Sequence, residues 1–411
     1  MGRKATLLAV LPMVCAAAAI GVVALVRSAP GEAKAADVRV DARIVDADNA
    51  FGIELFKRLG EDEKWSRNVF VSPAGIALAL TMTYNGASGA VRDAMAKTLR
   101  LQGIDLEEVN KANAALLANL EGPGPGVTLS IANSLWAREG FDFELDFMER
   151  NREFYRAQVS SLDFSDPSAK DTINAWIEGK TQDRIKNMLD RIDPAAILLL
   201  VNAVYFKGEW THKFPAARTH DDEFTLSDGA KKMVPMMSRR GKFGYLKGEG
   251  FQAVRLPYGE GRVAMYVFLP SEESNLAALA GQLTLENWKS ATASFQDVEG
   301  YIAMPRFKTE YTANLNDPLK ALGMEPAFVA SDTDWKPMTS ADQVLINRVL
   351  HKSFLEVNEE GTEAAAATVV EMALKAAPIG DVRVVVDRPF FLAIRDDKTG
   401  VVLFAGAIVD P

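Results

Sequence analysis

Few side chains in this sequence have the types and spacings that catalysis requires. The 411 residues include three histidines, His212, His220 and His351, and one cysteine, Cys15. Catalytic serines and zinc-binding histidines commonly occur in local patterns such as Gly-x-Ser-x-Gly and His-Glu-x-x-His. Neither pattern occurs here, and neither does the glycine-rich spacing of a phosphate-binding loop. The sequence therefore predicts a protein that is not an enzyme and that uses no cofactor.

Three short segments resemble binding sites but favour simpler interpretations. Gly122 to Gly126 is rich in glycine, yet its prolines lack the amide hydrogens that would hold a phosphate, so it is typical of a turn. Thr219 to Glu223 places one histidine beside three acids, and without ligands from elsewhere we expect a solvated loop there. His351 follows an apolar run and is expected to be a buried, hydrogen-bonded histidine. We therefore predict no metal site.

The composition is that of an ordinary globular protein, with 48% hydrophobic and 25% charged residues. The formal net charge is -9, and no long run of like charge occurs. Proteins that bind nucleic acid usually carry a basic stripe, so we expect no nucleic acid among the partners. A single cysteine can form neither an internal disulfide nor a cysteine-based metal site.

The first residues have the pattern of an export segment. Arg3 and Lys4 precede an uncharged run of 22 residues from Ala5 to Val26. A positive start followed by an apolar stretch is typical of a secretory signal, and Ala33 to Ala35 offers a small-x-small cleavage site. The run is also long enough to cross a bilayer as an uncleaved anchor, since a span takes about 20 residues. Both interpretations predict that the bulk of the protein is exported to an extracellular or periplasmic space.

This pattern divides the chain into two expected parts. Residues 1–36 are expected to be the export signal or membrane anchor with a short linker, and contact with a membrane is expected only through residues 5–26. Beyond this point no linker rich in Pro, Gly or Ser interrupts the sequence, and no internal repeat occurs. Residues 37–411 are therefore expected to form a single domain.

Helical signals dominate the first half of the chain, and strand signals dominate the second. Ser72 followed by Pro73 is typical of a helix start, and an apolar run follows. Further helices are predicted over 93–101 and 168–189, and a buried strand is predicted over 196–210. This order predicts an α+β fold. β-Branched and aromatic runs, with a hairpin turn at Lys398 to Gly400, predict strands over 252–258, 263–270, 301–313, 383–396 and 401–409.

Four segments, in order along the chain, resemble the serpins, a family of serine protease inhibitors that work by a large conformational change. The resemblance covers nearly everything from about Asn49 to the C-terminus. It implies a helix-rich N-terminal half around a large central mixed sheet, a smaller antiparallel sheet, and an exposed reactive-centre loop at about 359–380. The four segments are Asn68–Leu80 (NVFVSPAGIALAL), Leu198–Trp210 (LLLVNAVYFKGEW), Leu350–Ala367 (LHKSFLEVNEEGTEAAAA) and Asp387–Pro411 (DRPFFLAIRDDKTGVVLFAGAIVDP).

In serpins the reactive-centre loop is the bait for a target protease. Cleavage forms an acyl-enzyme, and the freed loop inserts as a new strand into the central sheet and drags the protease with it. The resemblance thus implies a suicide substrate that acts as a monomer and forms a covalent 1:1 complex. The hinge that enters the sheet first matches nine residues here: Glu359, Glu360, Gly361, Thr362, Glu363, Ala364, Ala365, Ala366 and Ala367.

The loop sequence itself suits a half-buried strand. Every second residue from Thr362 to Leu374 is uncharged, and the three charges fall in the alternate set, at Glu363, Glu371 and Lys375. These charges also lie on one stripe of a helix, so periodicity alone leaves strand and helix open, and the resemblance favours the strand. The hinge contains no bulky residue and no inward charge, which a packed interior would disfavour. This composition matches inhibitory serpins, with a non-inhibitory binding or carrier serpin as the alternative.

Counting along the loop identifies the bait residue. Lys375 lies 14 residues after Gly361 and 15 residues before Phe390, a spacing found in several serpins. This count places the scissile bond between Lys375 and Ala376, and lysine suits a trypsin-like protease, whose specificity pocket carries a carboxylate. A slip of one residue would make Leu374 the bait and favour a chymotrypsin- or elastase-like protease. Inhibition of a cysteine protease, which also forms an acyl-enzyme, is a further alternative.

The resemblance also implies which residues control the opening of the central sheet. Ser72, Asn202 and His351 match a polar cluster under the central strands, and Trp210 matches a residue at the top of the sheet, where insertion begins. Gly75 departs from the family pattern, because many serpins carry a serine there. We expect the missing hydroxyl to rearrange or loosen the hydrogen bonding of this gate.

Overall fold

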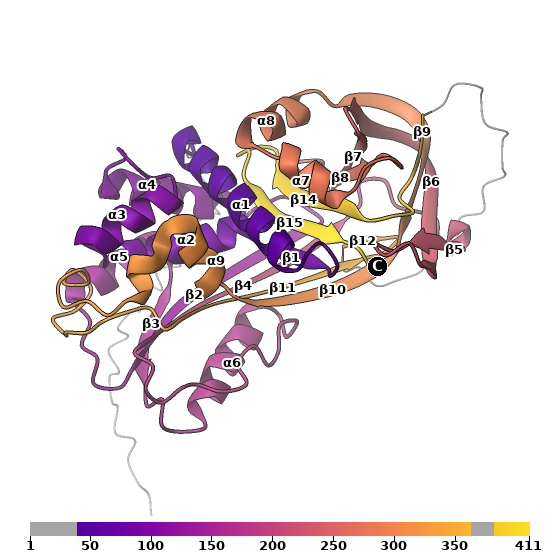
Figure 1. Ribbon diagram of the computed structural model, residues 1–411. Helices are drawn as coiled ribbons and strands as arrows, with labels where there is room; N and C mark the ends of the chain where they lie inside the picture. Colours follow the sequence, from indigo (N-terminus) through magenta and orange to yellow (C-terminus); the bar gives the residue numbers. More distant parts are fainter. Residues whose placement is uncertain (1–38, 363–381) are drawn as a thin grey trace, which may run out of the picture. The chain divides into compact units, whose positions relative to one another are not determined.

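The computed structural model describes residues 39–362 and 382–411, which belong to one compact unit, Asp37–Pro411 (Figure 1). Two predicted features lie wholly or mostly outside the described residues: the export segment, and the reactive-centre loop predicted over about 359–380, of which only 359–362 are described. Within the two described ranges, no helix is both long enough and apolar enough to span a membrane. The predicted division into an N-terminal segment and a single domain stays a prediction.

Six of the described strands form the central sheet, in the order β10–β11–β12–β4–β2–β3. β4 runs antiparallel to β2 and parallel to β11, so the sheet is mixed. The buried strand predicted over 196–210 is confirmed as β4, in the middle of this sheet. The strands are β2 (Val127–Arg138), β3 (Gln158–Leu162), β4 (Leu198–Glu209), β10 (Phe307–Asn314), β11 (Arg348–Val357) and β12 (Gly361–Thr362).

Nine of the described strands form a second sheet, in the order β1–β15–β14–β8–β7–β6–β9–β13, with β5 paired to β6. β13 runs parallel to β9, and the other pairs are antiparallel. The predicted hairpin turn between β14 and β15 is confirmed, and Gly400 takes a φ of 86° there, which suits glycine. The strands are β1 (Val69–Val71), β5 (His220–Thr225), β6 (Lys231–Gly248), β7 (Phe251–Tyr258), β8 (Val263–Pro270), β9 (Gln296–Pro305), β13 (Val382–Val385), β14 (Phe390–Asp396) and β15 (Val402–Ile408).

Helices cover both faces of the central sheet, with α6 on one face and α1 and α2 on the other (Figure 1). This arrangement confirms the predicted α+β fold. The helices are α1 (Ala42–Asp62), α2 (Pro73–Tyr84), α3 (Gly89–Thr98), α4 (Leu106–Leu120), α5 (Leu145–Tyr155), α6 (Ala169–Lys180), α7 (Leu276–Gln282), α8 (Leu285–Ala293) and α9 (Asn316–Leu319). Shorter helical turns cover Ala216–Arg218, Lys320–Met324 and Glu325–Phe328.

β4 is buried on both faces, and its side chains alternate between two hydrophobic cores. Leu200 and Val204 belong to the large core that includes α1 and α2. Val201 and Ala203 belong to the smaller core under α6. Because successive side chains of a strand point to opposite faces, a strand added beside β4 would also divide its residues between these two cores.

α2 begins where the sequence predicts. The Ser72 hydroxyl accepts a hydrogen bond from the Gly75 amide at 3.2 Å, and Pro73 takes the first helical turn. Every residue from Pro73 to Tyr84 is buried. A helix that is apolar on all sides belongs in the interior of a domain, and α2 packs against α1, β4 and β15.

The helix predicted over 168–189 is only partly correct, because α6 ends nine residues early. Gln182 and Asp183 take φ values of 52° and 60°, a left-handed conformation that cannot continue the helix. The chain beyond them remains packed, and the Asn174 side chain bonds both the amide and the carbonyl of Leu189. The apolar spacing of this segment therefore indicated burial correctly but overstated the length of the helix.

Four other predicted elements differ from the structure. α3 begins four residues earlier than predicted. The strand predicted over 301–313 is divided at Arg306 into β9 and β10, which belong to different sheets. The strand predicted over 383–396 is divided into β13 and β14, and Pro389 between them has no amide for a ladder hydrogen bond. The segment 219–223, predicted to be a loop, lies mostly in the edge strand β5, although its charged side chains are exposed as expected.

Candidate hinge and sheet gate

The hinge lies at the head of a gap between two strands of the central sheet. Farther along the sheet, β4 and β11 pair directly, and Tyr205 is the partner of Phe354. Beyond this pair the two strands separate, and β12 lies between them. Thr362 is paired with Gly208 of β4 on one side and with Val357 of β11 on the other. The hinge therefore already occupies the first position of a strand that could continue between β4 and β11.

Gly361 can hold this position because it has no β-carbon. Its φ is 150°, and a β-carbon would lie 2.0 Å from the Gly208 carbonyl oxygen and 2.7 Å from the Glu209 Cα. The turn that precedes it is closed by Asn358, whose side-chain oxygen accepts hydrogen bonds from the amides of Glu360 and Gly361 at 3.0 and 3.2 Å. The close approach of two backbones explains why a glycine is needed here.

Thr362 faces the large core. It is fully buried, and its hydroxyl is hydrogen-bonded to the Tyr258 hydroxyl at 2.7 Å. Burial raises the pKa of Tyr258, so this phenol stays protonated. The Tyr258 ring stacks on Trp210 with ring centres 4.4 Å apart. Tyr258 was not anticipated from the sequence, because nothing local in β7 indicates that its hydroxyl meets a residue 104 positions away.

Trp210 holds the turn from Asn358 to Gly361 through two hydrogen bonds. Its backbone amide donates to the Glu360 carbonyl at 2.9 Å, and its indole Nε1 donates to the Asn358 carbonyl at 2.9 Å. The Phe214 amide donates to the Glu359 carbonyl at 2.9 Å. The structure thus places Trp210 directly against the hinge, at the end of the sheet where β12 enters.

The two glutamates of the hinge are bound by side chains on the surface. Glu359 accepts a hydrogen bond from the Thr219 hydroxyl at 2.6 Å and lies 3.6 Å from the Arg306 guanidinium. Glu360 forms an ion pair with Lys213, and its carboxylate raises the pKa of that lysine. Because these groups contact solvent, water can replace each of them at little cost.

Ser72, Asn202 and His351, the predicted gate residues, are hydrogen-bonded to one another in the interior. The Ser72 amide donates to His351 Nε2 at 3.2 Å, so Nδ1 carries the proton and donates to the Asn202 side-chain oxygen at 2.6 Å. The Asn202 amide group in turn donates to Asn133 Oδ1 at 2.7 Å. Asn202 and His351 are direct partners on β4 and β11, and Asn133 lies on β2. This series of side-chain hydrogen bonds therefore links the three strands β11, β4 and β2.

His351 is neutral in this setting. It is fully buried, and burial lowers its pKa to about 3. The expectation that it is a buried, hydrogen-bonded histidine is confirmed. Asn133 was missed by the sequence analysis, although it interrupts the alternate apolar positions Ile131 and Leu135 of β2, a signal that indicates a buried polar contact.

Gly75 is packed tightly against the gate. A β-carbon at Gly75 would lie 2.6 Å from Val204 Cγ2, 2.9 Å from Asn202 Nδ2 and 3.0 Å from Ser72 Oγ. The Ser72 hydroxyl donates to the Leu403 carbonyl at 2.7 Å. The hydrogen bonding of the gate is therefore complete with glycine at this position, and the space that a serine side chain would take is already filled by its neighbours.

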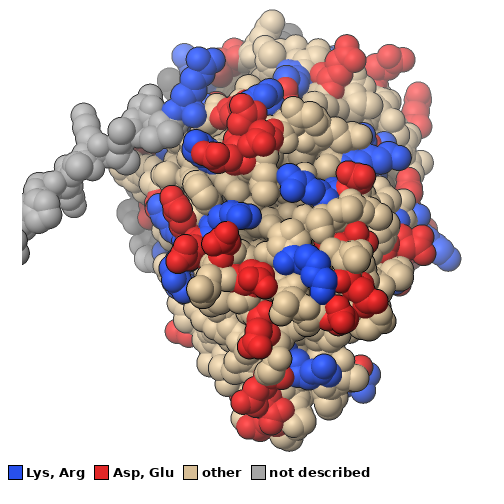
Figure 2. All heavy atoms as spheres, turned by 90° about the vertical axis from the view of Figure 1, so that its left-hand side faces the viewer, with Lys and Arg blue, Asp and Glu red and all other residues tan. Residues whose placement is uncertain are grey.

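The remaining predicted site residues lie outside the described residues. These are the scissile pair, Lys375 and Ala376, and the hinge from Glu363 to Ala367. Within residues 39–362 and 382–411, no group of three or more His, Cys, Asp or Glu side chains is arranged to hold a metal ion. On the face shown in Figure 2, acidic and basic side chains are interspersed rather than gathered by sign.

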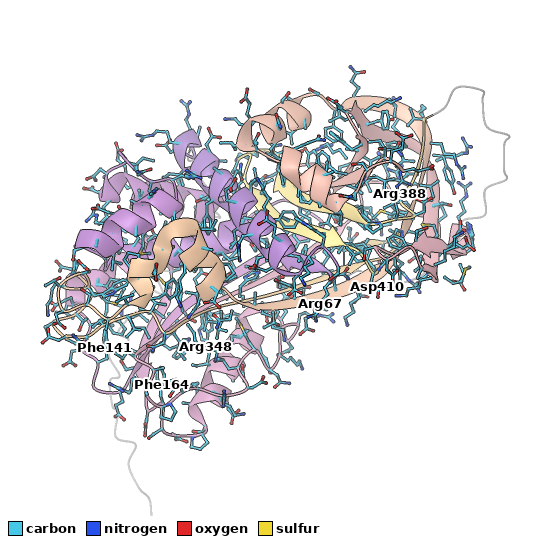
Figure 3. All side chains as sticks on the ribbon, viewed as in Figure 1. Arg67, Phe141, Phe164, Arg348, Arg388 and Asp410 are labelled. Atoms are coloured by element: carbon cyan, nitrogen blue, oxygen red, sulfur yellow. The ribbon has the colours of Figure 1, made fainter. Side chains whose placement is uncertain are left out.

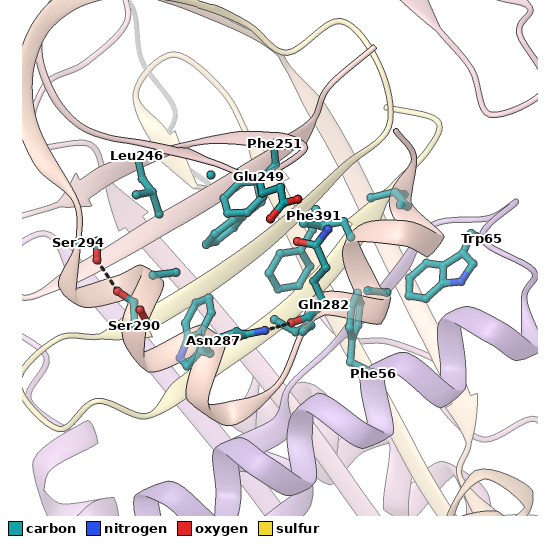
Figure 4. A pocket seen from close by; sticks show the side chains of 18 residues that line it. Phe56, Trp65, Leu246, Glu249, Phe251, Gln282, Asn287, Ser290, Ser294 and Phe391 are labelled. Carbon is teal, nitrogen blue, oxygen red and sulfur yellow. Dashed lines mark hydrogen bonds between the residues drawn. The ribbon is translucent and has the colours of Figure 1, made fainter. Parts of the chain in front are cut away.

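A separate pocket lies between α7, α8 and the second sheet (Figure 4). Its volume is 320 Å³. Two of its rings lie flat against glycines: a β-carbon on Gly60 would lie 2.2 Å from the Trp65 ring, and one on Gly248 would lie 2.2 Å from the Phe251 ring. Trp65 also takes a φ of 53°, which few non-glycine residues adopt. The aromatic residues of the lining are Phe56, Trp65, Phe251, Phe268, Trp288 and Phe391.

Comparison with known proteins identifies the family. Residues 46–411 match the family model of the serpins, described as serine protease inhibitors. The chain is 35% identical to the leukocyte elastase inhibitor of Bos taurus over 379 residues, which is 89% of this chain and 98% of the relative. Because the match to this family of protease inhibitors covers most of the chain, the prediction that the chain is not an enzyme is confirmed.

Two solved structures agree with this match. The native state of the thermophilic serpin tengpin superposes with a TM-score of 0.85 at 30% identity, covering 91% of this chain and 95% of tengpin. Human thyroxine-binding globulin, in complex with thyroxine, gives a TM-score of 0.83 at 25% identity, covering 90% of this chain and 99% of the globulin. The family match, the relative and the fold agree over nearly the whole described chain, and the chain belongs to the serpin family.

Proposed function

We propose that this serpin is an inhibitor that traps a serine protease as a covalent acyl-enzyme. The observation that carries the proposal is the position of β12, whose two residues already lie between β4 and β11. A loop attached directly to this strand can extend it after cleavage without any change of register. The same observation explains why the hinge needs a glycine followed by small residues.

The register of β12 defines the proposed path. Thr362 pairs with Gly208 of β4 and with Val357 of β11, and both pairings are antiparallel. Each step forward along the loop therefore moves one residue back along β4 and one residue back along β11. Continuing this register brings Ala366 beside Val204, and Thr368 beside Asn202 and His351. These β4 side chains point into the large core or the gate, so the uncharged set of loop residues is the set that becomes buried.

The gate must open along this path. The hydrogen bond from His351 to Asn202 joins β11 to β4 at the level where Thr368 would arrive. Breaking it costs on the order of 1 kcal/mol unless a new partner replaces it. Threonine offers a hydroxyl that can both donate and accept, so Thr368 can take over part of this bonding in the inserted state.

The same register places Glu371 beside Arg348, at the far end of β11 from the hinge (Figure 3). Burial, and next the nearby Arg191, lower the pKa of Arg348. A carboxylate that arrives beside two arginines would offset both effects, and it would favour the fully inserted loop over a partly inserted one. The charged set of loop residues is thus suited to the face of the sheet that carries α6.

The proposed reaction needs no catalytic group from this chain. The serine of the protease attacks the Lys375 carbonyl, the bond to Ala376 breaks, and the amine of Ala376 leaves with a proton while an ester joins Lys375 to the protease. Insertion then forms new backbone hydrogen bonds, each adding about 1 kcal/mol net. A displacement of catalytic atoms by about 1 Å can slow deacylation ~100-fold. The native form is then a kinetically trapped state.

The proposed target is a trypsin-like serine protease, because Lys375 fits a specificity pocket with a carboxylate. The relative from Bos taurus is named as an inhibitor of leukocyte elastase, and this favours keeping Leu374 as the alternative bait for an elastase- or chymotrypsin-like protease. A cysteine protease remains a further alternative. The proposed product in each case is a covalent 1:1 complex.

A denaturing gel tests the proposal directly. The purified chain is mixed with trypsin, and a band at the summed mass that survives boiling is the expected result. Lys375→Ala should abolish this band for trypsin. Ala366→Arg places a charge in the uncharged set and should convert the inhibitor into a cleaved substrate. Glu363→Lys changes a charge in the alternate set and should leave trapping intact. Cleavage without any adduct by trypsin-, elastase- and chymotrypsin-like proteases would contradict the proposal.

We further propose that the chain is exported through residues 1–36, on the basis of the positive start and apolar run alone. The test is to express the full chain with its own N-terminus and to sequence the N-terminus of the product outside the cytoplasm. A start near Asp37 is expected for a cleaved signal. Recovery of the whole chain in the membrane fraction would favour the anchor, and full-length chain in the cytoplasm would contradict export.

A second candidate function is the binding of an apolar small molecule in the aromatic pocket of 320 Å³. Ligand pockets are commonly apolar and of about 300–1,000 Å³. Thyroxine-binding globulin, which shares the fold, was solved with thyroxine. Titration with Nile red should give saturable 1:1 fluorescence, and Ala291→Trp should fill the pocket and remove it. Non-saturable binding, or binding that Ala291→Trp leaves unchanged, would contradict this function.

A further inference from the structure

Two arginines flank a tyrosine on three adjacent strands of the second sheet. Tyr301 of β9 is the direct partner of Arg240 on β6 and of Arg383 on β13. The Arg383 guanidinium carbon lies 4.4 Å from the centre of the Tyr301 ring, and that of Arg240 lies 5.7 Å from it. Both distances are within the range of cation–π contacts. Arg240, Tyr301 and Arg383 are called the arginine–tyrosine ladder below.

The ladder faces solvent. Arg240 and Arg383 are exposed, and Tyr301 is half-buried. The residues one position along each strand point to the opposite side, where Ile302 and Val384 are buried. Alternation of side chains across the sheet therefore places all three members of the ladder on the same outer face.

The surroundings of the ladder are more basic than the chain as a whole. The next row of the sheet pairs the exposed Lys242 with the exposed Glu299. The row on the other side consists of Ser238, Ala303 and Val385, which carry no charge. Among the described residues, these three rows hold three cations and one carboxylate, whereas the formal net charge of the chain is -9.

The ladder also lies close along the chain to the proposed scissile bond. β13 begins at Val382, six residues after Ala376. Six extended residues reach at most about 22 Å. A protease of ~220 residues has a radius of gyration of about 17 Å. The ladder therefore lies within reach of a protease bound at Lys375 and Ala376, and the residues that connect the two are those after the scissile bond.

We propose that the arginine–tyrosine ladder is an accessory docking surface for acidic side chains on the target protease. The proposal rests on the proposed inhibitory function and adds a specificity determinant to it. A guanidinium that lies on an aromatic ring has a restricted orientation, and its N–H groups can donate two parallel hydrogen bonds to a carboxylate. Charges at the rim of an interface act chiefly on the rate of association and make that rate depend on salt.

The test measures the rate of loop consumption, counting both trapped and cleaved product. The probes are an anionic and a cationic trypsin, which share a specificity for lysine and differ in surface charge. The test variant is Arg240→Glu with Arg383→Glu. The matched control is Arg67→Glu with Arg152→Glu, which makes the same change of charge on exposed residues after α1 and on α5. Circular dichroism checks that each variant is folded.

The expected result is a fall of about tenfold in the second-order rate constant of the ladder variant with anionic trypsin at low salt, since steering by charge changes association rates by 10-fold or more. The control should change by less than about twofold, and the difference should vanish at high salt. The effect with cationic trypsin should be smaller. Equal rates for wild type and ladder variant with anionic trypsin at low salt would overturn the proposal.

Variants of Tyr301 test whether the ring must orient the two guanidinium groups or whether their positive charge alone is sufficient. Tyr301→Phe keeps the ring and should keep the wild-type rate, whereas Tyr301→Ala keeps both charges and should lower the rate about threefold. Equal rates for these two variants would overturn the role of the ring. Because loop consumption is counted even without an adduct, a missing covalent band contradicts the inhibitory function, whereas an unchanged rate contradicts the ladder.

Discussion

The hinge and the gate both contact β4 and β11, but they are held in opposite ways. The hinge glutamates are bound by Lys213, Thr219 and Arg306, whose side chains contact solvent. At the gate, Asn202 and His351 are completely buried and are joined by neutral hydrogen bonds. Water can replace the first set of contacts at little cost, whereas a buried polar group that loses its partner is costly. The contacts of the hinge glutamates are therefore the weaker set, and the buried hydrogen bonds of Asn202 and His351 are the more costly set to break.

The largest effect is expected when the gate is broken. Asn202→Ala removes the acceptor for His351 and the donor to Asn133 and leaves both partners buried. The free energy of unfolding should fall by about 3 kcal/mol, since each unsatisfied group costs ~1–3 kcal/mol. Denaturant unfolding measures this change. Lys207→Ala, on the same strand but half-exposed, is the control and should change stability by less than about 0.5 kcal/mol. Equal losses in the two variants would remove the distinction between gate and surface.

A serine in place of Gly75 should lower the stability of the folded protein rather than raise it. Gly75→Ser places a β-carbon 2.6 Å from Val204 Cγ2, and overpacking of this kind costs about 2 kcal/mol. Adding Val204→Ala should relieve the clash, so the double variant should lose less than the sum of the two single variants. Thermal unfolding of the four proteins completes the cycle. A single Gly75→Ser variant more stable than wild type would show that glycine loosens the gate.

The gate should also give the protein a pH dependence that the hinge does not. The pKa of His351 is lowered to about 3 in the folded chain. Below about pH 6.5 the unfolded chain therefore binds more protons than the folded chain, and the free energy of unfolding decreases as the pH is lowered. The slope should approach 1.4 kcal/mol per pH unit. Asp48 acts in the opposite direction, because burial raises its pKa to about 8 and stability is lost as pH rises toward that value. The comparison is therefore made with His351→Gln, whose curve should lack the acid loss; identical curves would contradict the assignment.

The smallest effect is expected at the hinge itself. Thr362→Val removes the buried hydroxyl contact with Tyr258 and should weaken the seating of β12 by about 1 kcal/mol. Amide exchange at Gly361 should then be roughly five times faster, as measured by hydrogen–deuterium exchange. Thr219→Val removes a partly solvated contact with Glu359 and should have less effect. A larger effect from Thr219→Val would show that surface contacts, and not the buried hydroxyl, seat the hinge.

Local sequence patterns determined several parts of this protein. The cap at Ser72 with Pro73 fixed the start of α2, and the apolar run around Leu200 fixed β4 as a buried strand. The first follows from capping of free amides within one segment, and the second from a continuous apolar run, which is typical of a strand covered on both faces. The resemblance to serpins, carried by four such segments in order, predicted the fold and a polar cluster of Ser72, Asn202 and His351.

Tertiary structure decided everything that depends on partners far apart in the chain. β12 is a strand only because β4 and β11 separate at that level. α6 ends at Lys180, where the chain turns and then returns to bond Asn174 through Leu189. Asn133 is hydrogen-bonded to the gate residue Asn202, 69 positions away in the sequence. Tyr258 is hydrogen-bonded to the hinge residue Thr362, 104 positions away. The arginine–tyrosine ladder needs three strands in register. A sequence determines local conformation through nearby contacts, whereas register and burial depend on the free energy of the whole packed sheet, and only the fold settles them.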